Sequence, residues 1–184
     1  MDVSFINKLF KSKSNDDFCT AVVLAAGNSQ RMGKDKILMP LGGAPVIAHT
    51  LKALQSAECI DEIVVVTKYE SLQELADICN DHGISKASKV VVGGKTRLES
   101  SLIGVSNADE RAKYIAIHDG ARPFVTNSLI ERVVHSAHQH GASAPAVSAT
   151  DTVRILNAKG AVVETPSRDL VCLLYTSPSP RDRG

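Results

Sequence analysis

The sequence lacks the features that mark several large classes of protein. Its formal net charge is only +1, from 21 basic and 20 acidic residues, so it lacks the strongly basic balance of a protein that binds a nucleic-acid backbone. No apolar run approaches the roughly 18 residues of a membrane span, and the N-terminus lacks the apolar core of a secretory signal. We therefore expect no nucleic-acid partner, no membrane partner and a cytoplasmic location.

Patterns that hold metals or run redox chemistry are also missing. The four cysteines include no C-x-x-C pair, which argues against a zinc site or a redox dithiol and favours reduced, mostly buried thiols. Three histidines between residues 135 and 140 lie on or just beyond a predicted surface helix, with no carboxylate in register. We therefore do not expect a metal site there.

What is present is the composition of an ordinary globular domain. The 184 residues are 43% hydrophobic and 22% charged, which is close to the average for soluble proteins. A chain of this length forms one domain that buries about 70% of the surface exposed by the unfolded chain. We place this domain at residues 18–174, after an N-terminal extension at 1–17. The extension carries a short basic amphipathic pattern, and a helix lying on a membrane surface is the alternative to a frayed end.

Apolar runs alternate with helical patterns along the domain. The predicted order is strand 21–25, helix 45–56, strand 63–67, helix 72–82, strand 89–92, helix 99–107, strand 114–117, helix 127–139 and strand 144–147. Asn127 or Ser128 is the expected cap of the last helix. Such alternation predicts an α/β fold with a mostly parallel sheet and helices on both faces.

A hairpin arm is expected at about residues 150–171. Two short β-branched runs, 153–155 and 162–163, are separated by turn residues that include Asn157 and Gly160. Because exposed arms of this kind pair chains, we expect a homodimer that forms through the hairpin.

The strongest local signal for function follows the first strand. Residues 24–33 read LAAGNSQRMG, and Lys36 follows three residues later. Loop amides, Arg31 and Lys36 could together surround a polyphosphate. Two better-known phosphate motifs fail here: Gly27 and Gly33 do not have the spacing of a Walker loop, and no G-x-G-x-x-G is present.

This loop resembles the signature of sugar-nucleotide and alditol-phosphate nucleotidyltransferases, and later motifs narrow the likeness. Gly93-Gly94 with Arg97 and Ser100, then residues 118–123 (HDGARP), Asp151-Thr152, and Thr165 with Arg168 occur in the order seen in 2-C-methyl-D-erythritol 4-phosphate cytidylyltransferases. The resemblance covers about residues 20–171 and implies a Rossmann-like three-layer nucleotidyltransferase fold with a protruding arm. The related ribitol-5-phosphate cytidylyltransferases are the alternative, and a non-catalytic nucleotide-binding fragment is another.

The resemblance implies a role for each matching residue. Arg31 and Lys36 would be the catalytic cations, and Asp119 would hold Mg²⁺, which suits a carboxylate at a strand end. Asp119 would also contact the alditol phosphate, together with Arg122, Thr152 and Arg168, the last acting across a dimer. The residues that would bind the nucleotide are Ala25, Ala26, Gly27, Asn28, Ser29, Gly93, Gly94, Lys95 and Ser100. Lys95 stands where many relatives carry an acidic residue.

The sequence departs from the family pattern at its end. Relatives continue past the arm with a QTPQ-like segment, an acidic segment and a late lysine, and none of these is present. Residues 175–184 instead read YTSPSPRDRG, which has neither helical nor strand periodicity. We interpret this tail as disordered or as the product of an interrupted reading frame. We expect the 184-residue chain to have little or no transferase activity.

Overall fold

The computed structural model describes residues 17–27 and 35–174. The N-terminal extension at 1–16, part of the predicted nucleotide loop and the tail lie outside the described residues. The chain divides into two compact units, residues 1–141 and 142–184.

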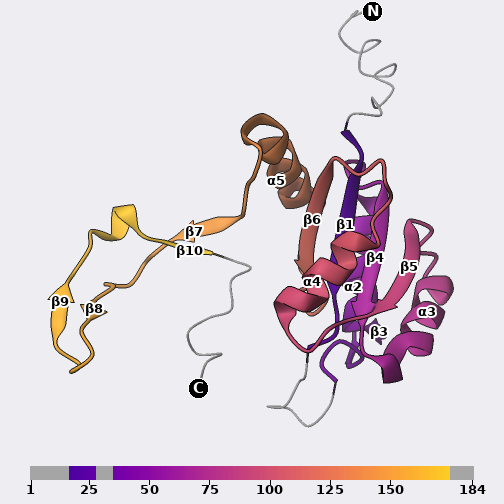
Figure 1. Cartoon of the computed structure of the whole chain (residues 1–184), viewed down its shortest axis with the longest axis horizontal. Coiled ribbons are helices and arrows are strands. Elements are labelled where there is room, and N and C mark those ends of the chain that lie inside the picture. The colour runs from indigo at the N-terminus through magenta and orange to yellow at the C-terminus, as the bar shows by residue number, and fades with distance from the viewer. Residues whose placement is uncertain (1–16, 28–34, 175–184) are drawn as a thin grey trace, which may run out of the picture. The chain divides into compact units, whose positions relative to one another are not determined.

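The first unit is an α/β layer structure (Figure 1). Its elements in chain order are β1 (Cys19–Leu24), β2 (Pro40–Leu41), β3 (Ala44–Pro45), α2 (Val46–Ser56), β4 (Glu62–Thr67), the 3-10 turn η2 (Tyr69–Ser71), α3 (Leu72–Asp81), β5 (Ala87–Val92), α4 (Arg97–Ser106), β6 (Tyr114–Asp119) and α5 (Asn127–His140). Among the described residues, the main sheet has the order β5-β4-β1-β6, and all its strand pairs are parallel.

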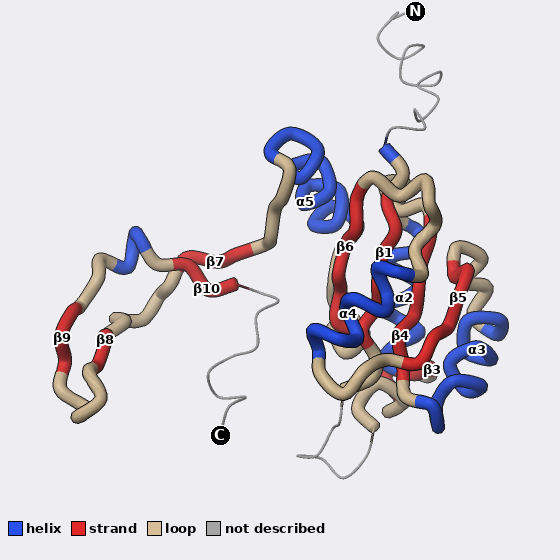
Figure 2. Tube along the Cα trace, viewed as in Figure 1, coloured by secondary structure: helices blue, strands red, loops and turns tan. Residues whose placement is uncertain are grey.

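Helices cover both faces of this sheet (Figure 2). On one face, α2, α3 and α5 pack against the side chains of alternate residues of β1 and β4, such as Val23 and Val65. On the other face, α4 packs against the intervening residues, such as Val22 and Val64. The two central strands are buried on both sides, which explains their continuous apolar runs. The predicted fold class is confirmed.

One detail of the sequence prediction is wrong. Helix α5 begins at Asn127, but its cap is the preceding residue, Thr126, whose hydroxyl accepts a hydrogen bond from Leu129 N at 3.3 Å. Threonine is a good N-cap, and its extended backbone lies just outside the helix. The apolar pattern predicts the helix itself but not which of three neighbouring polar residues caps it.

The described residues of the second unit form two short antiparallel strand pairs. Strand β7 (Ala146–Ser148) pairs with β10 (Cys172–Leu174), and β8 (Ile155–Leu156) pairs with β9 (Val162–Glu164). A 3-10 turn, η3 (Arg168–Leu170), follows β9. Asn157 shapes the hairpin turn, since its carboxamide oxygen accepts bonds from the amides of Lys159 and Ala161. The predicted hairpin is present.

Candidate active site

The carboxyl ends of the parallel strands meet at one edge of the sheet. In the strand register, Leu24 at the end of β1 pairs with Val66 of β4 and with Asp119 of β6. At the same level, Thr67 of β4 pairs with Val92 of β5. Open α/β sheets bind their ligands at this edge. The loops that leave these strands therefore form the candidate site.

Backbone hydrogen bonds extend the strand pairing into the loops. Ala25 N donates to Val66 O at 2.7 Å, and Gly93 N donates to Thr67 O at 2.7 Å. On the other side of β1, Gly120 N donates to Leu24 O at 2.8 Å. The first residues of each loop are consequently held as firmly as the strands.

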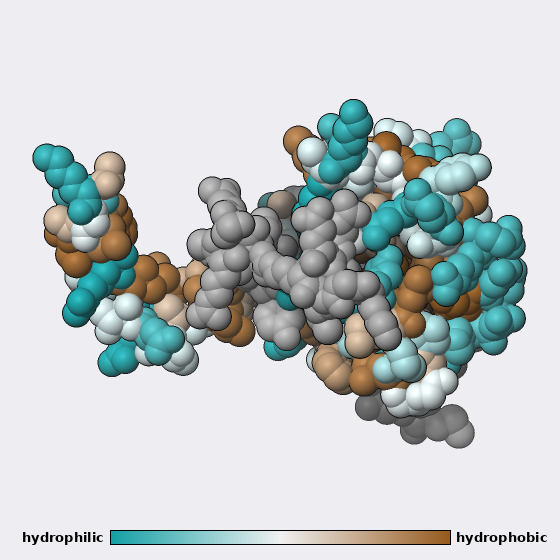
Figure 3. All heavy atoms as spheres, turned by 90° about the horizontal axis from the view of Figure 1, so that it is seen from below, coloured by the Kyte–Doolittle hydropathy of each residue, from teal (hydrophilic) through white to brown (hydrophobic). Residues whose placement is uncertain are grey.

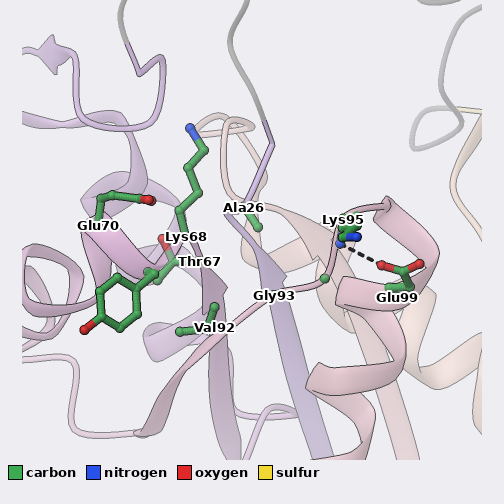
Figure 4. Close-up of a pocket in the computed structure, with 10 residues that line it drawn as sticks. Ala26, Thr67, Lys68, Glu70, Val92, Gly93, Lys95 and Glu99 are labelled. Carbon is green, nitrogen blue, oxygen red and sulfur yellow. Dashed lines mark hydrogen bonds between the residues drawn. The ribbon is translucent and has the colours of Figure 1, made fainter.

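A cavity of about 630 Å³ lies among the loops that follow β1, β4 and β5 (Figure 4). Its lining residues are Ala26, Thr67, Lys68, Tyr69, Glu70, Val92, Gly93, Gly94, Lys95 and Glu99. The volume is typical of a small-molecule site. The lining contains two lysines and two glutamates, so its formal charges cancel. The cavity therefore suits a neutral ring at least as well as a phosphate.

The N-terminus of α4 forms one wall of the cavity and is fixed by its own side chains. Thr96 and Glu99 form a capping box, in which Glu99 N donates to Thr96 Oγ1 at 3.1 Å and Thr96 N donates to Glu99 Oε2 at 3.3 Å. Glu99 Oε2 also accepts from Lys95 N at 2.6 Å. Gly94 N donates to the buried Ser100 hydroxyl at 3.2 Å. This wall is therefore ordered before any ligand binds.

Asp119 lies at the end of β6 between two arginines. Arg97 Nη2, from the first turn of α4, is 3.0 Å from Asp119 Oδ1, and Arg122 Nε is 3.0 Å from Asp119 Oδ2. The carboxylate side chain is 26% exposed. The ion pair with Arg97 links the α4 wall to β6, across residues that are far apart in the sequence. The two guanidinium groups leave this part of the site with a positive charge.

His118 precedes Asp119, and its ring is largely removed from solvent. Burial lowers the pKa of His118, so the imidazole is neutral at pH 7. Among the described residues, no group forms a hydrogen bond with its Nδ1 atom. His118 thus adds no charge to the site.

The structure brings most of the predicted site residues to this edge. Asp119 ends β6, Ser100 lies in the first turns of α4, and the other described members lie in the loops that follow β1, β5 and β6: Ala25, Ala26, Gly27, Gly93, Gly94, Lys95 and Arg122. Lys36 is exposed and lies in the turn that follows the nucleotide loop. Two predicted nucleotide contacts, Asn28 and Ser29, and the predicted catalytic cation Arg31 lie outside the described residues. Thr152 and Arg168 belong to the second unit, where both are exposed.

Sequence reasoning assigned no role to three residues that shape this site. Arg97 holds Asp119, while Glu99 and Lys68 line the cavity. The pattern Thr96-x-x-Glu99 is a capping-box signature and could have revealed the role of Glu99. Lys68 directly follows a buried strand, which is a position where ligand contacts are expected. The ion pair of Arg97 has no local sequence signal.

The carboxylate oxygens of Asp119 can serve as ligands of Mg²⁺ only if a bound polyphosphate supplies further oxygen ligands. Among residues 17–27 and 35–174, no group of three or more histidine, cysteine or carboxylate side chains gathers to hold a metal. Each oxygen of Asp119 accepts one arginine hydrogen bond and keeps a further lone pair. Mg²⁺ takes one or two carboxylates plus substrate phosphates. The anionic phosphates would also offset the charge of the two arginines.

A parallel α/β sheet with a small-residue loop after its first strand, and with basic residues at the same edge, is the arrangement expected of a nucleotidyltransferase. The family model of 2-C-methyl-D-erythritol 4-phosphate cytidylyltransferase matches residues 19–180. The chain belongs to this family. The family likeness found in the sequence is therefore confirmed.

Individual relatives agree with this assignment. The 2-C-methyl-D-erythritol 4-phosphate cytidylyltransferase of Clostridium botulinum (strain ATCC 19397 / Type A) is 35% identical over 159 residues, which cover 85% of this chain and 69% of the relative. The crystal structure of the 4-diphosphocytidyl-2C-methyl-D-erythritol synthase from Anaerococcus prevotii matches with a TM-score of 0.77 and 27% identity, covering 86% of this chain and 68% of that one. The cytidylyltransferase from Thermus thermophilus matches with a TM-score of 0.61, 25% identity, and coverage of 83% and 65%.

No helix in the described part of the chain is long and apolar enough to cross a membrane.

Proposed function

We propose that the protein transfers a cytidylyl group from CTP to 2-C-methyl-D-erythritol 4-phosphate and releases pyrophosphate, a step in non-mevalonate isoprenoid synthesis. The observation that carries this proposal is the family match over residues 19–180. The convergence of the family's motifs at one edge of the sheet supports it. We propose the cytoplasm as the location, on the sequence features given above.

The proposed reaction is an in-line displacement at the α-phosphorus of CTP. A phosphate oxygen of the acceptor forms the new bond, while the bond to the bridging oxygen breaks and pyrophosphate leaves with that oxygen. Such chemistry requires positioning and charge stabilisation rather than a covalent nucleophile. We assign charge stabilisation to Arg31 and Lys36, the cations on and just after the small-residue loop.

We place the cytosine ring in the cavity beside the start of α4. The buried Ser100 hydroxyl accepts from Gly94 N at 3.2 Å and donates to Gly94 O at 3.4 Å, so it fixes the Gly94 backbone on the cavity wall. The carbonyl oxygen of Gly94 and the Ser100 hydroxyl oxygen each keep a lone pair, which would accept from the amino group of the base. Backbone groups of Ala25, Ala26 and Gly27 would support the nucleotide from the β1 side.

Asp119 and Arg122 would bind the acceptor, with Asp119 as one oxygen ligand of Mg²⁺. The metal would supply charge neutralisation to the phosphates when bound. Asp119→Asn removes the charge of this ligand, so we expect a weaker response to Mg²⁺ in a metal titration of CTP binding. A titration identical to that of the parent protein would remove Asp119 from the metal site.

The second unit supplies the proposed dimer contact. Its hairpin exposes the large apolar side chains Ile155, Leu156, Val162 and Val163, and hydrophobic atoms are visible over this unit (Figure 3). An isolated two-stranded ribbon is marginal in water, which favours pairing with a second copy. Thr152 and Arg168 would then reach the acceptor in the neighbouring site. A monomeric mass across micromolar concentrations, with activity retained, would refute this arrangement if it were found for the version extended with the relatives' C-terminal segments.

Calorimetric titration followed by product analysis tests the function. We expect CTP to bind more tightly than UTP or ATP. In a version extended with the C-terminal segments that relatives carry, 2-C-methyl-D-erythritol 4-phosphate should give a cytidylylated product and pyrophosphate. Product formed only with ribitol 5-phosphate would identify the related enzyme instead. CTP binding without product from either acceptor would indicate a nucleotide-binding protein, and failure to prefer CTP would refute the proposal.

Variants of the two cations provide a second test. In a version extended with the C-terminal segments that relatives carry, Arg31→Ala and Lys36→Ala should each lower turnover by about a hundredfold or more. Neither should lower the melting temperature, because each removes a charge aimed at the transition state. Lys52→Ala on the exposed face of α2 is the matched control. Unchanged turnover in both site variants would contradict the assignment.

A further inference from the structure

An ion pair joins the segment that carries Lys36 to the end of β4. Lys68 directly follows β4, and its Nζ atom lies 3.1 Å from Asp35 Oδ2. The two side chains are only 25% and 18% exposed. The aliphatic part of Lys68 lines the cavity (Figure 4). The partner of this lysine, Asp35, is the immediate chain neighbour of Lys36.

The residue that follows Lys36 in the chain is held by the core. Ile37 is buried, with 5% of its surface exposed, and its carbonyl oxygen accepts from Ile47 N at 2.9 Å in the first turn of α2. Asp35 O accepts from Leu38 N at 3.1 Å, which closes a turn around Lys36. The backbone of Lys36 therefore lies between one residue fixed by the core and one residue fixed by Lys68.

We propose that Lys68 is a positioning residue for Lys36 and acts through Asp35. This inference rests on the proposed function of Lys36 as a phosphate-binding cation. The ion pair holds the backbone that precedes Lys36 against the end of β4, so that the ammonium group of Lys36 is presented at a defined place beside the nucleotide. A displacement of about 1 Å in such a group can cost a hundredfold in rate. The contribution of Lys68 is thus geometric.

A direct phosphate contact by Lys68 is the competing explanation, because this residue also lines the cavity. The two explanations differ in how the effects of changing Lys68 and Lys36 on CTP affinity combine. If Lys68 acts through Lys36, removing its charge matters only while Lys36 is present. If Lys68 binds the nucleotide itself, the losses of affinity from the two changes add.

The test is a double-variant cycle on CTP affinity, measured by calorimetry with the 184-residue chain. Lys68→Met keeps the apolar stem of the side chain and removes its charge. We expect it to raise the Kd for CTP about fivefold, a coupling of about 1 kcal/mol, and to have no effect in the Lys36→Ala background. Lys68→Arg should retain the parental affinity, and Lys52→Met is the control for the loss of a lysine elsewhere.

A second measurement reports the position of Lys36 without any nucleotide. The backbone NMR order parameter of Lys36 should be near 0.85 in the parent chain and should fall toward the flexible range below about 0.6 in Lys68→Met. Additive losses of CTP affinity, or an unchanged order parameter, would overturn the proposal. A parent chain that failed to bind CTP would contradict the proposed function, and the order parameter would still decide whether Lys68 holds this backbone.

Discussion

Gly93 is the residue at which a single added methyl group should disturb both stability and nucleotide binding. A Cβ atom at this position would lie 2.8 Å from Ser100 Oγ, 2.9 Å from Ala26 Cβ and 3.0 Å from Val66 Cγ1. Carbon atoms in favourable contact are about 3.5–4.0 Å apart. All three neighbours would therefore have to move, and Val66 is fully buried in the sheet.

The expected magnitude of Gly93→Ala follows from this geometry. Forcing one extra methyl into a packed site costs about 1–3 kcal/mol of unfolding free energy, and each kcal/mol corresponds to about 2–4 °C in Tm for a domain of this size. Displacement of Ser100 also disturbs its hydrogen bond with Gly94. We therefore expect CTP affinity to fall at least about tenfold, or about 1.4 kcal/mol.

Thermal unfolding without ligand and calorimetric CTP titration are the assays. Gly27→Ala is the control for stability, because no atom lies within 4 Å of the Cβ that it would add, and it should leave Tm unchanged or slightly raised. Ala26→Gly should restore part of the lost stability in the Gly93→Ala background. If Gly93→Ala matched the parent in both Tm and CTP affinity, the tight wall at the start of α4 would be ruled out.

Three further predictions concern stability and reactivity. Gly104→Ala should lower Tm although alanine favours helices, because the new Cβ would overlap Val22 and push α4 off the sheet; an unchanged or higher Tm would contradict this packing. Thr67→Val should leave Tm unchanged or raise it, since the buried Thr67 hydroxyl has no hydrogen-bond partner among the described residues, whereas a fall of several degrees would reveal a partner. Burial raises the pKa of the Cys79 thiol, so a thiol reagent at pH 7–8 should modify the exposed Cys172 much faster than Cys79; equal rates by mass spectrometry would refute this order.

The order of strands and helices could be predicted from the sequence because it depends on local patterns. Continuous β-branched runs such as residues 63–66 correspond to strands that are buried on both faces. Helix α3 follows the 3.6-residue spacing of Leu72, Leu75 and Cys79. Some errors are at element ends: β6 extends through Asp119 rather than stopping at residue 117. Others concern short strands, since β2, β3 and β10 were not predicted and β7 pairs with β10 outside the main sheet. Strand ends depend on pairing with neighbours, and the polar residues there carry no apolar periodicity.

The loops of the site were also visible in the sequence, because small residues and cations directly follow strands and parallel strands all end at one edge. The sequence did not indicate which charged side chains form ion pairs across that edge. Arg97 meets Asp119 from 22 positions away, and Lys68 meets Asp35 from 33 positions away. These contacts form only when β1, β4 and β6 lie in register and α4 packs on their common face. Local sequence therefore determined the elements and their order, while tertiary structure decided the charge pairs, because no local pattern records the distance between segments that the sheet brings together.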